Sequence, residues 1–245
     1  MKPTKTILAI IIAISFTSCQ KEKSNDPNNP ASSKVKTYTE DATEGGTHSV
    51  ITFDVTYDAS NRPVSLISES SPGDKFVLQY GSGSFTLDLY NSNVVSVHEV
   101  SFLNSNSLID STFQYNDTSD STTEKYIYNS AKQLITLKEY DYSKANGTQL
   151  FNTTNYTYDS NGNPQSETDD FSVTTYEYTT FVNNLVFMPT YLPVAKNLVK
   201  TTTVTSGGSS SVLNHSYTFD GSNRLSTEKI TDDNGNILIK SYTYY

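Results

Sequence analysis

Asn155-Tyr156-Thr157-Tyr158-Asp159-Ser160-Asn161-Gly162-Asn163-Pro164 is the stretch that decides the fold. Alternate side chains of a strand face opposite sides, so Tyr156 and Tyr158 share one face. Asn161-Gly162 predicts a type I′ turn, because both residues tolerate positive φ. Pro164 has no N–H to donate to a ladder, and it therefore belongs at a strand start or a sheet edge. The stretch predicts a strand, a tight turn and a new strand.

The same frame recurs along the chain. An aromatic residue is followed by Asp or Asn, and Pro or Leu stands six residues after the aromatic. The other copies are Tyr57-Asp58-Ala59-Ser60-Asn61-Arg62-Pro63, Tyr128-Asn129-Ser130-Ala131-Lys132-Gln133-Leu134 and Phe219-Asp220-Gly221-Ser222-Asn223-Arg224-Leu225. Asp233-Asn234-Gly235-Asn236 is a further turn of this kind. Because the copies are unevenly spaced, they predict repeated hairpins and not a strict solenoid.

This unit resembles the tyrosine-aspartate (YD, or Rhs-type) repeat, whose core reads Tyr-Asp-x-x-Gly-Arg-Leu. Gly162 matches the repeat's glycine in one copy, and Arg62 and Arg224 match its arginine in two. Over residues 34–245 the chain is similar to small Bacteroidota lipoproteins of unknown function, including a family with a porin-like, antiparallel β fold. The resemblance implies a fold and no catalytic residue.

The rest of the chain has the same strand-and-turn spacing. Apolar and polar residues alternate in segments of 8–12 residues, and no segment has a helical period of 3.6. We predict one all-β domain over residues 34–245, an antiparallel up-and-down meander that curls, forms a half-barrel or closes like a barrel. The polar run Asn116–Thr123 is expected to be a loop. After the strand Leu150–Tyr158, the next strand is expected around Phe171–Tyr178.

The N-terminus has the features of a secretion signal. Lys2 and Lys5 precede the apolar run Ile7–Ile14, which is too short to span a bilayer as a helix. Phe16-Thr17-Ser18-Cys19 then resembles a bacterial lipobox, and Cys19 is the only cysteine of the chain. We expect residues 1–18 to be a signal peptide and Cys19 to be lipidated.

Residues 19–33 are expected to form the lipidated end and a disordered tether, because they are rich in Lys, Asn, Asp, Ser and Pro. Gln20-Lys21-Glu22-Lys23 resembles the surface-export signal of some Bacteroidota lipoproteins. We therefore expect a lipid anchor in the outer membrane with the domain at the cell surface. The formal net charge of −9 argues against nucleic acid as a partner, since phosphate contacts need clustered Lys and Arg.

One apolar segment departs from the strand pattern. Phe181–Leu198 contains Pro189 and Pro193, which exclude a regular central strand or a long helix. We expect an irregular plug or a short helix that fills one end of the sheet. In the alternative interpretation the segment walls a hydrophobic ligand pocket. The candidate ligand-binding residues are Leu185, Phe187, Tyr191 and Leu192.

Reaction chemistry is not visible in the sequence. The three histidines, His48, His98 and His215, have no metal-ligand spacing, and there is no nucleophile elbow and no nucleotide-binding glycine pattern. We expect no enzyme activity, no cofactor and no metal.

The expected function is that of a membrane-anchored lipoprotein of the bacterial envelope, a binding or assembly module. Its partner would be a glycan, a lipid or an envelope protein, bound by exposed tyrosine rows. The alternative is a carrier of an apolar ligand such as lipid in a half-barrel cavity. A transmembrane barrel is disfavoured, because Asp and Glu interrupt the alternation too often to leave a lipid-facing band.

Overall fold

The computed structural model describes residues 34–116, 121–143, 146–185, 192 and 194–245, and in these residues it contains sixteen strands. The strands are β1 (Val35–Glu44), β2 (Thr47–Tyr57), β3 (Pro63–Ser68), β4 (Lys75–Tyr80), β5 (Ser84–Asn91), β6 (Val94–Leu103), β7 (Ile109–Asn116), β8 (Ser121–Tyr128), β9 (Leu134–Ser143), β10 (Gly147–Tyr158), β11 (Pro164–Thr168), β12 (Ser172–Val182), β13 (Asn197–Ser206), β14 (Ser209–Phe219), β15 (Leu225–Thr231) and β16 (Ile237–Tyr244).

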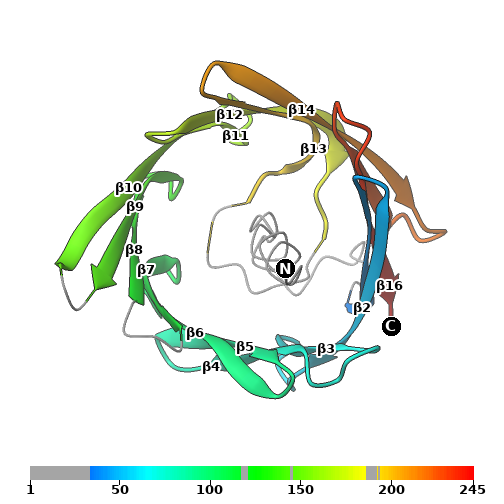
Figure 1. Cartoon of the computed structure of the whole chain (residues 1–245), viewed down its shortest axis with the longest axis horizontal. Coiled ribbons are helices and arrows are strands. Elements are labelled where there is room, and N and C mark those ends of the chain that lie inside the picture. The colour runs from blue at the N-terminus through cyan, green and yellow to red at the C-terminus, as the bar shows by residue number, and fades with distance from the viewer. Residues whose placement is uncertain (1–33, 117–120, 144–145, 186–191, 193) are drawn as a thin grey trace.

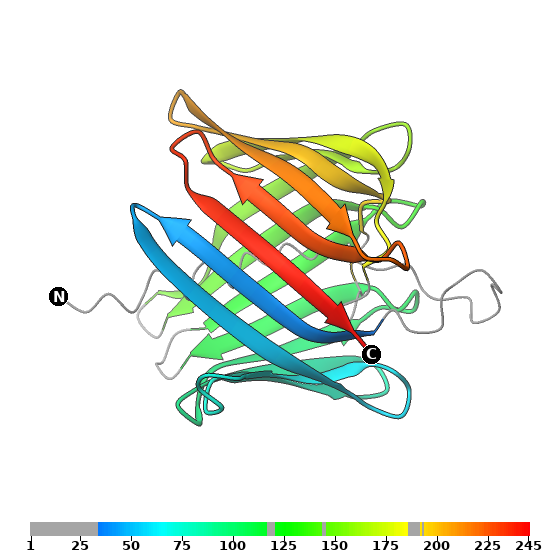
Figure 2. The same cartoon turned by 90° about the vertical axis from the view of Figure 1, so that its right-hand side faces the viewer.

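The strands form one closed antiparallel barrel. Each strand pairs with its neighbour in sequence, and β1 pairs with β16 to complete the ring (Figure 1). The seam places Tyr38 opposite Tyr242, and Figure 2 shows blue β1 beside red β16. The predicted all-β, up-and-down, barrel-like fold is confirmed, and the sheet closes fully.

The Asp159 turn differs from the predicted type I′ geometry. Of its central residues only Gly162 has a positive φ, and Asn161 does not. The carboxylate of Asp159 instead accepts the backbone N–H groups of Asn161 and Asn163, at 2.9 and 2.8 Å. This side-chain cap closes a longer turn, so the prediction of a two-residue type I′ turn was wrong. Pro164 begins β11, as the sequence predicted.

Six turns share this geometry. Each begins with Asp or Asn, whose side-chain oxygen accepts the N–H groups two and four residues later, and each has a left-handed residue three positions on. The turns begin at Asp58, Asn104, Asn129, Asp159, Asp220 and Asp232. Their left-handed residues are Asn61, Ser107, Lys132, Gly162, Asn223 and Gly235. The turns thus explain why Asp or Asn follows the aromatic of the repeat.

Seven tyrosines make a second recurrent bond, and three of them, Tyr57, Tyr128 and Tyr158, directly precede such a turn. Each hydroxyl donates to a backbone carbonyl oxygen of an earlier strand, which is that of the first residue of the strand in six cases and that of Val199, the third residue of β13, in the seventh. We call these bonds the tyrosine latches. They are Tyr57 to Val35, Tyr80 to Pro63, Tyr128 to Ile109, Tyr158 to Leu134, Tyr178 to Pro164, Tyr217 to Val199 and Tyr244 to Leu225, at 2.6–2.9 Å. Four of the acceptors are the Pro or Leu of the repeat, and the latch from Tyr158 to Leu134 joins two consecutive copies.

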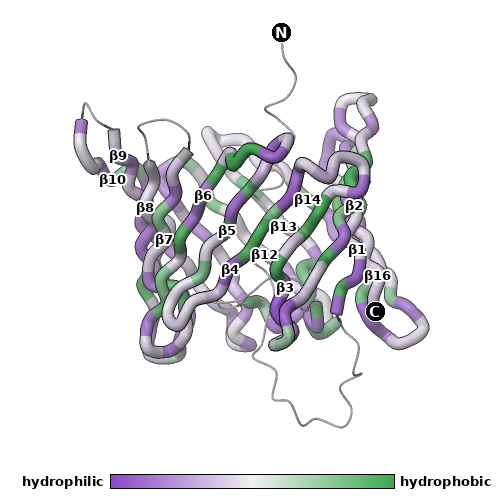
Figure 3. Tube along the Cα trace, turned by 90° about the horizontal axis from the view of Figure 1, so that it is seen from below, coloured by the Kyte–Doolittle hydropathy of each residue, from purple (hydrophilic) through white to green (hydrophobic). Residues whose placement is uncertain are grey.

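The buried side chains lie on the inner face of the barrel, where curvature brings them together. Tyr38, Phe53, Val55, Leu66 and Leu78 belong to one apolar cluster over β1–β4. Residues of opposite hydropathy alternate along many strands (Figure 3). This alternation gives a half-apolar inner face, as a single-layer barrel requires.

Hydroxyl pairs recur on the outer face. Pairs of Thr and Ser hydrogen-bond across neighbouring strands, where a membrane-spanning barrel carries apolar side chains. These pairs are Thr37–Thr243, Thr39–Thr52, Thr56–Ser65, Thr157–Ser166, Thr205–Ser210 and Thr218–Thr227. Large apolar side chains are also exposed, among them Phe102, Phe113, Tyr115 and Ile127 over β6–β8, and Leu150, Phe151, Phe171 and Val173 in the region of β10–β12.

The structure changes the predicted bounds of one loop and the predicted order of strands, and it does not describe the N-terminal residues. The run Asn116–Thr123 is not all loop, because β8 already begins at Ser121. The stretch Asn155–Pro164 predicted a new strand at Pro164, which is β11, but the strand expected after Leu150–Tyr158 was placed around Phe171–Tyr178, beyond it. Residues 1–33, which include the predicted signal peptide, Cys19 and tether, lie outside the described residues. No helix in the described part of the chain is long and apolar enough to cross a membrane.

Candidate ligand site in the barrel interior

The connection between β12 and β13 brings chain into the barrel. Its coloured portions, 183–185 and 194–196, run inside the ring in Figure 1. Asn163 fixes this connection to the β10–β11 turn. Its side-chain oxygen accepts the backbone N–H groups of Lys196 (2.7 Å) and Asn197 (3.2 Å), and its amide nitrogen donates to Asp159 (3.1 Å). Asn163 is 1% exposed and uses both polar atoms, so the connection has a defined position at this point.

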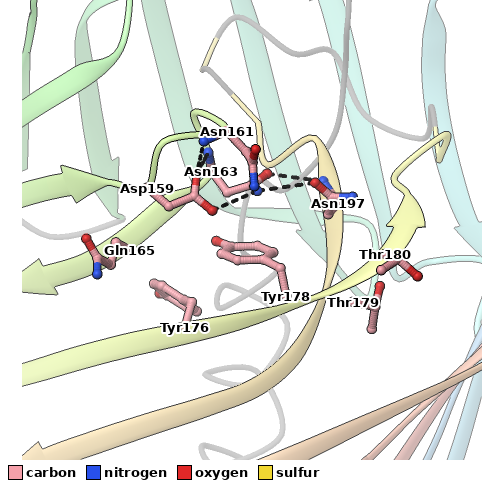
Figure 4. A pocket seen from close by; sticks show the side chains of 9 residues that line it. All are labelled: Asp159, Asn161, Asn163, Gln165, Tyr176, Tyr178, Thr179, Thr180 and Asn197. Atoms are coloured by element: carbon pink, nitrogen blue, oxygen red, sulfur yellow. Dashed lines mark hydrogen bonds between the residues drawn. The ribbon is translucent and has the colours of Figure 1, made fainter.

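A cavity of about 560 Å³ lies beside this junction. Figure 4 shows its lining, which comes from the β10–β11 turn, β11, β12 and the start of β13. The lining residues are Asp159, Asn161, Asn163, Gln165, Tyr176, Tyr178, Thr179, Thr180 and Asn197. The site is therefore built from amides, hydroxyls, two tyrosine rings and the carboxylate of Asp159.

The two tyrosines are held in place by their hydroxyls. Tyr178 donates to the carbonyl oxygen of Pro164 (2.6 Å), and Tyr176 donates to Glu167 (2.8 Å). Burial, together with the nearby Glu167 charge, raises the pKa of Tyr176 well above its ordinary value, so its hydroxyl stays protonated. The rings are fixed, whereas the exposed Gln165 side chain offers a donor and an acceptor to a ligand. Ring faces beside amides suit a hydroxyl-rich molecule.

The structure separates the residues that the sequence proposed as ligand-binding. Leu185 packs against the apolar cluster, and Leu192 is half-buried. Neither lines the 560 Å³ cavity. Phe187 and Tyr191 lie outside the described residues. Sequence reasoning did not single out Asn163 or Gln165, although an Asn that replaces the Arg of two other copies at position 163 was a visible signal.

Most tyrosines of the repeat face the interior. Exposed tyrosine rows were expected on the sheet, but the seven latch tyrosines use their hydroxyls on backbone carbonyls. Tyr115, Tyr142 and Tyr245 are exposed. The latch tyrosines therefore do not form the exposed rows that were expected, and the exposed aromatic side chains include phenylalanines such as Phe102, Phe151 and Phe171.

Each histidine pairs with one carboxylate, and the three pairs are separate. His48 contacts Asp41 at the surface, and His98 contacts Asp88. His215 faces the interior, where its Nδ1 lies 2.9 Å from Glu228.

The Nε2 of His215 lies 3.1 Å from the hydroxyl of Thr202, so hydroxyl, imidazole and carboxylate are in line. Thr202 lies within β13, which pairs with β12 and β14. Its neighbouring backbone amides serve the ladder and are not free to stabilise an oxyanion. We interpret this network as structural.

The interior carboxylates fall into two groups. Glu228 lies between His215 and Lys240, and these partners outweigh its burial and lower its pKa. Burial raises the pKa of Glu99 to about 7 and also raises the pKa of Glu124 and Glu167. Within the described ranges, no three His, Cys, Asp or Glu side chains are arranged to hold a metal ion.

Comparison with known proteins supports the fold. The chain is similar in structure to a porin-like protein from Bacteroides uniformis ATCC 8492, with a TM-score of 0.62 and 10% sequence identity over 86% of this chain and 98% of that chain. A porin-like protein from Bacteroides vulgatus ATCC 8482 gives a TM-score of 0.60 at the same identity and coverage. No family model matches the sequence, and no curated protein is similar to it. The fold is thus that of a porin-like, antiparallel β-barrel.

Proposed function

We propose that the protein is a lipid-anchored envelope lipoprotein whose barrel binds a hydroxyl-rich ligand, such as a short glycan, in the interior cavity. The observation that carries this proposal is the lining of the cavity. Tyr176 and Tyr178 offer ring faces, and Gln165 offers free amide groups beside them. Fixed aromatic faces with convergent hydrogen-bonding groups are typical of small-molecule sites.

The anchoring part of the proposal rests on the outer face and on the N-terminal sequence. Hydroxyl pairs lie on the outer face of β1–β2, of β10–β11 and at the seam with β16, and these parts are poorly suited to contact lipid. A lipid at Cys19 would attach the barrel to the outer membrane without inserting it. Lys34 lies at the end of the barrel that carries the cavity, because in the up-and-down barrel β1 begins at the end where β10 finishes and the β10–β11 turn lines the cavity. A tether of 14 residues could extend roughly 50 Å from the lipid.

A glycan array followed by calorimetry tests the binding part. The chain with Cys19→Ala, secreted to the periplasm, is screened against neutral oligosaccharides, and the best binder is titrated. Gln165→Ala should weaken binding by about tenfold, because one pair of hydrogen bonds to the ligand is lost. Gln79→Ala is the control, since Gln79 is exposed on the opposite face of the sheet. Equal affinities of the two variants would contradict the proposed site.

The second candidate is a carrier of an apolar ligand. It is favoured by the apolar cluster of β1–β4, which Leu185 contacts from the connection inside the barrel. Native mass spectrometry of the protein purified without detergent distinguishes the candidates. A co-purified apolar mass that is lost in Leu185→Asp would support the carrier, and an unliganded mass with retained glycan binding would support the first proposal.

A further inference from the structure

Three glutamates and one asparagine form a row on the inner face of β6–β10. We call Glu99, Glu124, Glu139 and Asn152 the acceptor cluster. Strand pairing places Glu124 directly opposite Glu139, and Glu139 directly opposite Asn152. Opposite side chains on one face have Cβ atoms about 5 Å apart. Glu99 lies two strands further round the barrel, and its carboxylate is close enough to feel the charge of Glu124.

Each glutamate of the cluster receives one hydrogen bond from the protein. Ser101 donates to Glu99 (3.3 Å), the Tyr126 hydroxyl donates to Glu124, and Asn152 Nδ2 donates to Glu139 (2.7 Å). These bonds occupy one oxygen of each carboxylate. None of the ion pairs between described residues involves the three glutamates. The negative charge of the cluster is therefore not balanced by the described chain.

Asn152 gives independent evidence that the cluster lacks a hydrogen-bond donor. The residue is only 8% exposed, and its Oδ1 is a buried side-chain atom without a hydrogen-bond partner among the described residues. Leaving such an acceptor unsatisfied costs about 1–3 kcal/mol. Its Nδ2 donates to Glu139, a member of the cluster. The described residues supply no donor to the Oδ1, and a donor on a ligand would satisfy it.

Glu228 is an interior carboxylate of the same barrel that, unlike the acceptor cluster, has basic side chains beside it among the described residues. Its oxygens lie 2.9 Å from His215 and 3.7 Å from Lys240. The described residues give the acceptor cluster no equivalent cationic partner, and burial disfavours the charge of Glu99 and Glu124. Glu228 and the acceptor cluster therefore differ in their charge partners. The cluster has the composition of a site for a positively charged group.

The geometry also limits the ligand. The free atoms of the cluster are all acceptors, so the ligand must supply donors. The carboxylates do not converge into a group that could hold one metal ion in the described structure. The strands from β6 to β9 span three strand spacings, about 14 Å. One small cation cannot reach all three carboxylates, whereas a chain with several ammonium groups can.

We propose that the acceptor cluster binds an organic polyamine, whose ammonium groups donate to Glu99, Glu124 and Glu139 and to the Oδ1 of Asn152. This inference goes beyond the proposed function and does not depend on it, because the cluster is not part of the cavity lining.

Calorimetric titration with spermidine tests the inference. The full chain with Cys19→Ala is titrated at low ionic strength, where charge pairs are least screened. We expect saturable binding that Glu124→Gln weakens at least tenfold and that Glu139→Gln weakens similarly. Tetraethylene glycol, an uncharged chain of similar length, should not bind.

Glu177→Gln is the matched control. Its carboxylate is 68% exposed on the outer face and pairs with Lys200, so spermidine affinity should not change. Asn152→Leu keeps all three carboxylates and should weaken binding several-fold. Circular dichroism checks that each variant is folded. The inference is overturned if the parent shows no saturable binding, as it would if the cluster only took up protons, or if Glu124→Gln binds as tightly as the parent. Retained glycan binding in Glu124→Gln would separate this result from the proposed function.

Discussion

The hydroxyl of Tyr158 donates a 2.8 Å hydrogen bond to the carbonyl oxygen of Leu134, 24 residues earlier. Tyr158 ends β10 and Leu134 begins β9, so the bond ties the hairpin together where its ladder stops. Leu134 closes one copy of the repeat and Tyr158 opens the next. Tyr178 donates in the same way to the carbonyl oxygen of Pro164, the last residue of the next copy, although Tyr178 itself opens no copy of the repeat.

Removing one latch should lower stability measurably. Tyr158→Phe keeps the ring and loses the bond to Leu134, and we expect the free energy of unfolding to fall by about 1–2 kcal/mol. Urea denaturation provides the measurement. Tyr142→Phe is the control, because Tyr142 is 43% exposed and has no latch. Losses of equal size in both variants would show that the latch contributes nothing.

The latches should also make the barrel sensitive to alkali. Burial raises the pKa of Tyr158 and Tyr244 to about 12, from 10.0 in an exposed tyrosine. The folded state therefore holds these protons more tightly than the unfolded state. Their contribution to stability is complete below pH 10 and is lost as the pH rises towards 12. Tyrosinate absorbance should rise late, together with unfolding, and ionisation near pH 10 with the fold intact would contradict this.

The left-handed position of the turns can be tested at Lys132, where φ is 64°. A side chain with a Cβ is strained in this conformation, whereas glycine is not. Lys132→Gly should raise the free energy of unfolding by about 1 kcal/mol. Ala131→Gly, in the same turn and without a positive φ, should lower it by about 0.5–1 kcal/mol. Thermal and urea unfolding of both variants decide the point, and a loss in Lys132→Gly would refute the assignment.

The interior ion pair should matter more than its exposed counterpart. Lys240 and Glu228 have side chains 16% and 15% exposed, so Lys240→Met leaves a buried charge with less compensation. We expect a loss of about 3 kcal/mol in unfolding free energy. Lys200→Met breaks the exposed pair with Glu177, at 62% and 68%, and should cost less than about 1 kcal/mol. Similar losses for the two variants would contradict the difference in burial.

Glu99 should destabilise the barrel when it ionises. Its pKa is about 7 in the folded state, against 4.5 in the unfolded state, so the folded state binds the proton more tightly. Its favourable contribution is present below pH 4.5 and is lost as the pH rises through 7. Glu99→Gln should therefore add about 1–3 kcal/mol at pH 8 and little at pH 4. A pH-independent effect of the substitution, measured by urea unfolding, would exclude this origin.

Much of the fold could be predicted from the sequence, because the alternation and the turn residues are local signals. The face shared by Tyr156 and Tyr158 and the strand start at Pro164 follow from the strand period and the missing N–H. Closure could not be predicted, since the register between β1 and β16 depends on the curvature accumulated over all the strands. The type of the Asp159 turn was predicted wrongly because the prediction relied on the Asn-Gly pair and did not consider that the Asp159 carboxylate could accept backbone N–H groups of the turn.

The candidate sites were harder to find than the fold. The sequence predicted a ligand site at apolar residues of the segment Phe181–Leu198. The cavity is instead lined mainly by amides and tyrosines in and beside the repeat. The acceptor cluster is spread over four strands, and its members come together only through the register of β6–β10. Neither arrangement leaves a motif of fixed spacing in the sequence.

The backbone N–H of Tyr245 lies 3.2 Å from the carbonyl oxygen of Lys34. The ring of strands is therefore closed, although the chain that forms it is linear. No strand of the ring is structurally the first. A circularly permuted chain that joined these two residues by a short linker and opened at Gly207-Gly208, where no neighbouring atom crowds the backbone, would contain the same sixteen pairings. The permutation would change the order in which the strands are synthesised. The first strand made, which can complete its pairing only when the last strand is made, would then be a different one.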